Sequence, residues 1–268
     1  MRPDPITVET IIRETAEAEI LPRFRHLSAA DISEKGPGDL VTIADTESEK
    51  VLARRLTELL PGSLAIGEEG VSADRATLDL LAGERPVWII DPVDGTNNFA
   101  NSVPCFAVIV CLVQRGQTLA GWIHDPLANS TVYGERGAGA WEDGQRLTVR
   151  PAGPLAAMTG SLKRSVRRQL ADRLAQGESG LPTIVKRYRC VGREYMDLAR
   201  GQLDFVAYGG TLKPWDHAAG VLIYGEAGGH AAMTATGAGY QLIPPSASGD
   251  ILLAPTPALW TAVGALYG

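Results

Sequence analysis

Residues 87–99 constrain the fold more than any other stretch of this chain. The apolar run Val87–Ile90 predicts a buried strand, and it leads directly into a short segment with two acids, Asp91 and Asp94. A Gly-Thr pair follows, and after it come residues that can begin a helix. The end of a buried strand is a rigid mount for ligands, and the start of a helix offers free backbone N–H groups. The segment therefore suits a site where divalent cations and a phosphate meet.

Acidic residues recur at three other predicted element ends. Asp45 and Glu68-Glu69 each follow a short apolar run, whereas Asp216 precedes a predicted helix. Element ends on one side of a sheet converge in space, so we expect these acids to meet. Oxygen ligands without histidine or cysteine favour Mg²⁺, Mn²⁺ or Ca²⁺ over zinc.

Each acidic position also has a simpler interpretation. Asp-Pro and Asp-Gly are common turn dipeptides, and Glu68-Glu69 alone is typical of a solvated turn. Asp45 and Asp216 are each placed to cap the N-terminus of a helix. The combination of all four clusters with the Asp-Pro-Val-Asp-Gly-Thr string favours the metal site.

Composition limits the partners. The net charge is −6, with 25 basic against 31 acidic residues, which argues against binding of nucleic acid or an anionic membrane. No stretch approaches the roughly 20 apolar residues that span a membrane. The three cysteines form no C-x-x-C pair, and we expect them to be reduced in a cytoplasmic protein.

Strands and helices alternate along the chain, which predicts a layered α/β (α+β) arrangement. Proline and glycine cluster at 151–154, and this cluster divides the chain into expected sub-domains 1–150 and 151–268. In the second half we expect helices at 166–175, 193–200, 217–227 and 258–266, and strands at 183–186, 203–208 and 251–254.

Several motifs together resemble the inositol monophosphatase family of lithium-sensitive, magnesium-dependent phosphatases. Asp91-Pro-Val-Asp-Gly-Thr-x-Asn-Phe resembles its main signature, and Trp215-Asp-His-Ala-Ala-Gly resembles its second. Ile66-Gly-Glu-Glu is similar to its glutamate motif, and Lys35 with the segment 39–45 is similar to its N-terminal loop. The motifs occur in the family's order, from about Ile11 to the C-terminus.

The resemblance implies a role for each matching residue. Two to three Mg²⁺ ions, or Mn²⁺, would be held by Glu68, Asp91, the Val93 carbonyl, Asp94 and Asp216. Thr96 and Asp45 would orient the attacking water, with Glu69 in a supporting role. The N–H groups of Gly95 and Thr96 would bind phosphate oxygens, and Asp94 would also contact the substrate.

The resemblance further implies an α-β-α-β-α sandwich with the site between two sub-domains, and a homodimer inhibited by lithium. The implied activity is hydrolysis of a small polyol or sugar phosphate, first of all inositol 1-phosphate. Fructose-1,6-bisphosphatase, histidinol-phosphatase and 3′-phosphoadenosine phosphatase activities are alternatives. A catalytically idle scaffold or regulatory protein of this fold is an alternative of another class.

Two segments depart from the family pattern. In inositol-specific members a glutamate before the second-signature aspartate contacts inositol hydroxyls, but segment 208–213 has no acid. The usual G-S/T-A-A substrate loop is also altered, at 190–195. Lys213 and Arg193 could therefore meet a second phosphate, which favours a bisphosphate sugar or a nucleotide. Solvated surface charge is the simpler interpretation of both.

Overall fold

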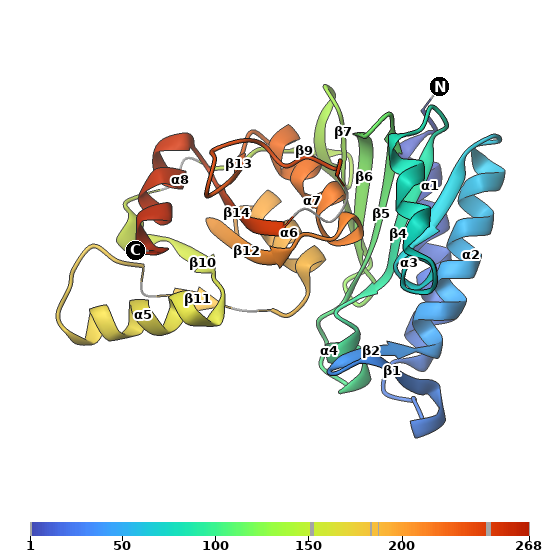
Figure 1. Cartoon of the computed structure of the whole chain (residues 1–268), viewed down its shortest axis with the longest axis horizontal. Helices are drawn as coiled ribbons and strands as arrows, with labels where there is room; N and C mark the ends of the chain where they lie inside the picture. Colours follow the sequence, from blue (N-terminus) through green and yellow to red (C-terminus); the bar gives the residue numbers. More distant parts are fainter. Residues whose placement is uncertain (1, 151–152, 183, 187, 245–247, 268) are drawn as a thin grey trace.

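Helices and sheets alternate in five layers in the computed structural model, which describes residues 2–150, 153–182, 184–186, 188–244 and 248–267. Figure 1 shows α1 and α2 on one outer side, then a seven-stranded sheet, then α6 and α7, then a five-stranded sheet, and finally α5 and α8. This is the layered α-β-α-β-α sandwich, so the predicted fold class is confirmed.

The larger sheet is built from strands that follow one another in the chain. Only the first pair, β3 and β4, is parallel, and the other neighbours are antiparallel. Its spatial order is β3 (Leu64–Gly67), β4 (Val87–Asp94), β5 (Ala107–Gln114), β6 (Gln117–Asp125), β7 (Ser130–Glu135), β8 (Gly139–Glu142) and β9 (Gln145–Leu147).

Strand β4 is buried along its whole length because helices cover both of its faces. Trp88 and Ile90 pack into the cluster formed with α1 (Pro5–Thr15) and α2 (Ile43–Leu59). The alternate residue Ile89 packs on the other side, against α6 (Val191–Ala199) and α7 (Pro214–Glu226). The continuous apolar run in the sequence thus reflects a strand with two dry faces.

The smaller sheet comes from the second half of the chain. Helices α5 (Arg164–Ala175) and α8 (Pro257–Gly264) cover its outer face, where Phe205 and Leu252 join their apolar residues in one cluster. Its spatial order is β11 (Ile184–Lys186), β10 (Thr159–Ser161), β12 (Phe205–Thr211), β14 (Ser248–Ala254) and β13 (His230–Met233).

Short elements complete the surface near the site. Strands β1 (Ile32–Gly36) and β2 (Asp39–Thr42) form a hairpin that leads into α2. Short α-helices α3 (Glu68–Ala73) and α4 (Thr96–Ala100) follow β3 and β4. The remaining helical turns are Ala16–Ile20, Leu21–Arg23, Ala29–Asp31, Arg75–Ala82, Leu155–Ala157 and Ala265–Tyr267.

Element bounds differ from the sequence predictions by up to three residues, and one of these differences concerns a functional helix. The sequence predicted a helix at 217–227 preceded by Asp216, but α7 begins at Pro214, and Asp216 lies in its first turn. Proline suits this position because its fixed φ is helical and its missing N–H would have no partner there.

The predicted division at residue 150 stays a prediction. Each sheet is built from one side of it, yet one apolar cluster joins Ile109 of the larger sheet to Leu253 of the smaller. Pro151 and Ala152, at the predicted boundary, lie outside the described residues. None of the helices in the described ranges combines the length and apolar character that a membrane crossing requires.

Helix α7 approaches the larger sheet closely at Gly121, where a Cβ would lie 2.8 Å from Ala219 Cα. Gly121→Ala should therefore lower the free energy of unfolding by about 1–3 kcal/mol, because helix and strand must separate. Gly225, on the same helix, faces open space, so Gly225→Ala should leave stability equal or raise it by about 0.5–1 kcal/mol. Urea unfolding measures both; an equal effect of the two substitutions would contradict the close packing.

Candidate metal centre and phosphate site

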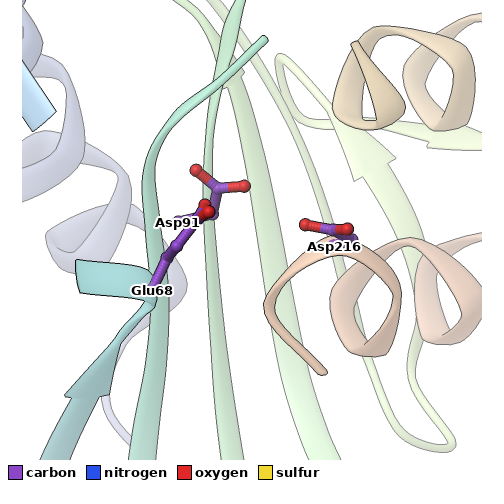
Figure 2. A group of neighbouring side chains, drawn as sticks. All are labelled: Glu68, Asp91 and Asp216. Atoms are coloured by element: carbon purple, nitrogen blue, oxygen red, sulfur yellow. The ribbon is translucent and has the colours of Figure 1, made fainter. Parts of the chain in front are cut away.

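Three carboxylates from three separate elements converge at one end of the larger sheet. Glu68 is the first residue of α3, Asp91 lies in β4, and Asp216 lies in the first turn of α7. One oxygen from each side chain lies within 4.8 Å of the others. In Figure 2, Glu68 and Asp91 lie side by side and Asp216 faces them from the other side. The structure therefore brings together three of the predicted metal ligands.

Asp91 lacks, within the described part of the chain, a partner that its buried charge needs. Asp91 Oδ1 is fully buried and has no hydrogen-bond partner among the described residues. Burial, and then the charge of Glu68, raise the pKa values of Asp91 and Asp216 well above the usual range. A divalent cation would remove both the repulsion and the unsatisfied oxygen. The oxygen-only donor set and this unpartnered atom therefore fit a hard cation such as Mg²⁺.

Two lysines act as counter-ions to Glu68. Lys35 Nζ lies 3.1 Å from Glu68 Oε1 and 3.0 Å from Glu69 Oε1. Lys213 Nζ lies 3.6 Å from the same Glu68 oxygen. The predicted supporting residue Glu69 is thus paired with Lys35, and burial raises its pKa. Both lysines sit where a bound cation would compete for Glu68.

A further acid, Glu49 of α2, holds the segment that carries Glu68. Its carboxylate accepts hydrogen bonds from the backbone N–H groups of Glu69 and Gly70, at 2.9 and 3.0 Å. These are unpaired N–H groups of the first turn of α3, so Glu49 caps that helix from a distance. These two hydrogen bonds hold the junction between β3 and α3 in place.

Asp45 and Thr96 form the pair that the family resemblance implies. Thr96 Oγ1 lies 3.0 Å from Asp45 Oδ1 and 2.9 Å from the Val93 carbonyl oxygen. Asp45 Oδ2 accepts from the N–H and hydroxyl of Thr42, which completes a capping box at the start of α2. Asp45 therefore both caps α2 and faces Thr96. Burial raises the pKa of Asp45 to about 7.

Asp94 has different neighbours from the other acids. Its Oδ1 accepts from the backbone N–H of Val191 at 3.1 Å, and its Oδ2 from that of Gly192 at 2.6 Å. The Cys190 thiol lies 3.0 Å from the same Oδ2. Asp94 lines the metal cavity, but its carboxylate is bonded to the start of α6. Its role as a metal ligand stays a prediction.

Gly95 joins the end of β4 to α4 in a conformation that glycine adopts readily. Its φ is 90°, and a Cβ there would meet the Cys105 carbonyl oxygen at 3.1 Å and Cys190 Cβ at 3.3 Å. Both the backbone conformation and the crowding therefore exclude other residues. Gly95 and Thr96 line the same cavity as the converging acids.

Two adjoining cavities share a boundary at this site. The metal cavity, of ≈ 500 Å³, contains Glu68, Asp91, Asp216, Gly95 and Thr96. A second cavity, of ≈ 280 Å³, includes Ser161, Lys163, Glu194 and Tyr208. Asp94, Arg189 and Asp216 line both. We call the second one the leaving-group cavity, because we expect an ester whose phosphate lies in the first to extend into it.

The predicted substrate contacts Arg193 and Lys213 lie elsewhere. Arg193 pairs with the buried carboxylate of Asp125 and lines neither of the two adjoining cavities. Lys213 pairs with Glu68 and lies over the ring of Trp215, 5.4 Å from its centroid. Neither residue is brought to the leaving-group cavity, and a contact with substrate stays a prediction for both.

Sequence reasoning missed three residues of the site. Glu49 carried no motif; its capping role depends on contacts across 20 residues. Glu194 is buried in the leaving-group cavity, where it accepts from Ser161 Oγ and from the Tyr188 N–H. Arg189 lies just before the altered substrate loop. Glu194 and Arg189 lie in or next to the altered loop at 190–195, and this position could have pointed to them.

Comparison with known proteins agrees with this geometry. The model of the inositol monophosphatase family matches residues 5–259. A fructose-1,6-bisphosphatase/inositol-1-monophosphatase of Thermotoga maritima is 32% identical over 209 residues, 76% of each chain. The Nus factor SuhB of Escherichia coli is 32% identical over 221 residues, 80% of this chain and 79% of its own.

Solved structures show the same fold. An IMPase of Thermotoga maritima superposes with a TM-score of 0.81 at 23% identity, covering 97% of this chain and 95% of its own. Together with the match over residues 5–259, this places the chain in the inositol monophosphatase family of phosphoric monoester hydrolases.

Proposed function

We propose that this phosphatase is Mg²⁺-dependent and hydrolyses a small polyol or sugar phosphate, with inositol 1-phosphate as the first candidate. One observation carries the proposal. Glu68, Asp91 and Asp216 converge within 4.8 Å, with a buried unpartnered oxygen on Asp91, in the cavity that Thr96 also lines. Mn²⁺ could replace Mg²⁺, because both prefer oxygen ligands.

Each residue of the site would have a separate role in metal binding or in activation of water. Glu68, Asp91, Asp94, Asp216 and the Val93 carbonyl would hold two to three cations. When bound, these ions offset the negative charge of the phosphate and lower the pKa of water. Asp45 orients the Thr96 hydroxyl, which can then accept a hydrogen bond from the attacking water.

Around the phosphate, Glu69 would support this arrangement through Lys35, its partner in the structure. The backbone N–H groups of Gly95 and Thr96 would receive phosphate oxygens. Asp94, which lines both cavities, would face the leaving group as well as the phosphate.

The substrate is the part of the proposal with the most alternatives. Thermotoga maritima has a relative named for both fructose 1,6-bisphosphate and inositol 1-phosphate hydrolysis. Histidinol phosphate and 3′-phosphoadenosine 5′-phosphate remain further candidates. Metal-dependent phosphate release from this panel tests the function, and specificity constants rank the substrates. No release from any member would contradict the proposal.

A regulatory role is the second candidate function, because the Escherichia coli relative is named a Nus factor. A protein that acts only as a scaffold does not need residues that bind a metal. Here, however, three acids converge and the Asp45–Thr96 pair is formed. Catalysis is therefore favoured.

For assembly and location, the family likeness suggests a homodimer in the cytoplasm.

Asp91→Asn should lower metal-dependent turnover by about 10³-fold or more, because it removes a charge from the centre of the ligand cluster. Calorimetric titration should show weaker Mg²⁺ binding as well. Asp79→Asn is the matched control, since Asp79 is exposed and lies outside the cavities. Full turnover in the Asp91 variant, with circular dichroism unchanged, would contradict the assigned role.

The acid cluster should make stability depend on pH and metal. Asp45 has a pKa of about 7 when folded, against about 3.9 unfolded. Between these values the folded state binds more protons, so the free energy of unfolding falls as pH rises. Asp91, Asp94 and Asp216 shift in the same direction.

In EDTA, the melting temperature should therefore be lower at pH 8 than at pH 5.5. Mg²⁺ should raise it more at pH 8, because metal binds deprotonated carboxylates. Differential scanning fluorimetry at the two pH values measures both effects. Equal stabilisation by Mg²⁺ at both would count against a carboxylate site.

Lithium should inhibit turnover, because a small hard cation can displace a weakly held metal ion from oxygen ligands. We expect a clear loss of phosphate release at roughly millimolar LiCl, with KCl at the same ionic strength as the control. Raising Mg²⁺ should relieve the inhibition if the two ions compete for one position. Turnover that does not change with LiCl would refute this prediction.

A further inference from the structure

Arg189 has an unusual backbone conformation at the edge of the metal cavity. Its φ is 57°, in the left-handed region that residues with a Cβ occupy only at a cost. The Asn98 side chain holds this turn, because its Nδ2 lies 2.9 Å from the Tyr188 carbonyl oxygen and 3.2 Å from that of Arg189. The same amide also reaches the Cys105 carbonyl oxygen at 2.8 Å. The turn therefore fixes the backbone of Arg189 beside the candidate active site.

Arg189 lies where the two cavities meet. It lines both the metal cavity and the leaving-group cavity. Among the described residues that line the metal cavity, it is the only basic one, beside the acids Asp39, Glu68, Asp91, Asp94 and Asp216. A group attached to the leaving side of a bound phosphate ester passes close to it.

Three basic residues described near the site are already paired. Lys35 and Lys213 bind Glu68, and Lys163 binds Asp250. The exposed Arg189 guanidinium, in contrast, makes no ion pair or side-chain hydrogen bond within the described part of the chain. Unlike these three lysines, Arg189 can engage a substrate without breaking an existing ion pair of the described residues.

The leaving-group cavity also limits where a second charge can lie. Its buried Glu194, which is not one of the proposed metal ligands, disfavours an anion that enters deeply. Neutral hydroxyls, in contrast, find partners there in Ser161 and Tyr208. An anionic group on the substrate is thus favoured beside Arg189, because Lys163, the other described basic residue that lines this cavity, is paired with Asp250.

We propose that Arg189 selects substrates that carry a second anionic group, a phosphate or a carboxylate, near the phosphate that is hydrolysed. This rests on the proposed phosphatase function of the same site. The planar guanidinium can donate two parallel hydrogen bonds to either group, which a lysine cannot reproduce. The second group does not react, so its contact should lower KM more than it raises kcat.

Matched substrates test the selection. Glycerol 2-phosphate and 2-phosphoglycerate differ by a carboxylate, and fructose 1-phosphate and fructose 1,6-bisphosphate differ by a phosphate. In the wild type, kcat/KM should be higher for the doubly anionic member of at least one pair, and the pair concerned identifies the anion. Arg189→Gly should reduce that preference about tenfold, mainly through KM, and leave the singly anionic ester within about twofold.

Two further variants serve as controls. Arg189→Lys keeps the charge but loses the planar fork, so its preference should be intermediate. Arg25 is an exposed arginine with φ 66° outside both cavities, so Arg25→Gly makes the same chemical change in the same backbone conformation. It should leave both substrates of each pair unaffected. The melting temperature of Arg189→Gly should not fall, because glycine adopts φ 57° without strain.

The outcomes separate this inference from the function on which it rests. Equal losses for both members of a pair would show that Arg189 acts on the reacting phosphate, and would overturn the proposal. An unchanged preference in Arg189→Gly would overturn it too, and both results leave the phosphatase function intact. Absence of metal-dependent hydrolysis of every ester by the wild type would instead refute the proposed function, and the selection with it.

Discussion

Repulsion between buried carboxylates is the constraint on which this structure depends. Glu68, Asp91 and Asp216 lie within 4.8 Å of one another, and Asp91 is almost fully buried. Like charges at such distances in a dry environment oppose folding unless something compensates them. Here Lys35 and Lys213 compensate Glu68, whereas one oxygen of Asp91 has no partner among the described residues. The rest of the fold must therefore be rigid enough to hold an arrangement that these side chains alone would avoid.

The layers supply that rigidity. Apolar clusters on both faces of the larger sheet bury β4, and α7 packs so closely on β6 that only glycine fits at position 121. The three acids come from β4, from the start of α3 and from the start of α7, which are elements anchored in these clusters. The favourable free energy of apolar packing thus offsets the repulsion between these acids, as is common at functional sites.

Local sequence patterns predicted the alternating strands and helices and the acids at element ends, whereas the five-layer sandwich and the roles of the site residues were implied by the family resemblance. The apolar run before Asp91 and the alternation of strands and helices are readable from neighbouring residues. Contacts between residues far apart in the chain could not be predicted from the sequence. Glu49 caps a helix 20 residues away, and the Asn98 amide fixes the backbone at Arg189, 91 residues away. No periodicity reveals such partners. The sequence prediction started α7 at residue 217, whereas this helix begins at Pro214, because proline suits the first turn of a helix.

The paired lysines have a consequence for how the site is filled. A cation held by Glu68 would compete for the oxygen that Lys35 and Lys213 now share. Loading the site would then be an ion exchange within the protein. Lys35 would keep Glu69 as its partner, whereas Lys213 would lose the carboxylate that it now pairs with. Without a cation, the same two lysines offset part of the charge of Glu68, which favours folding of the metal-free protein.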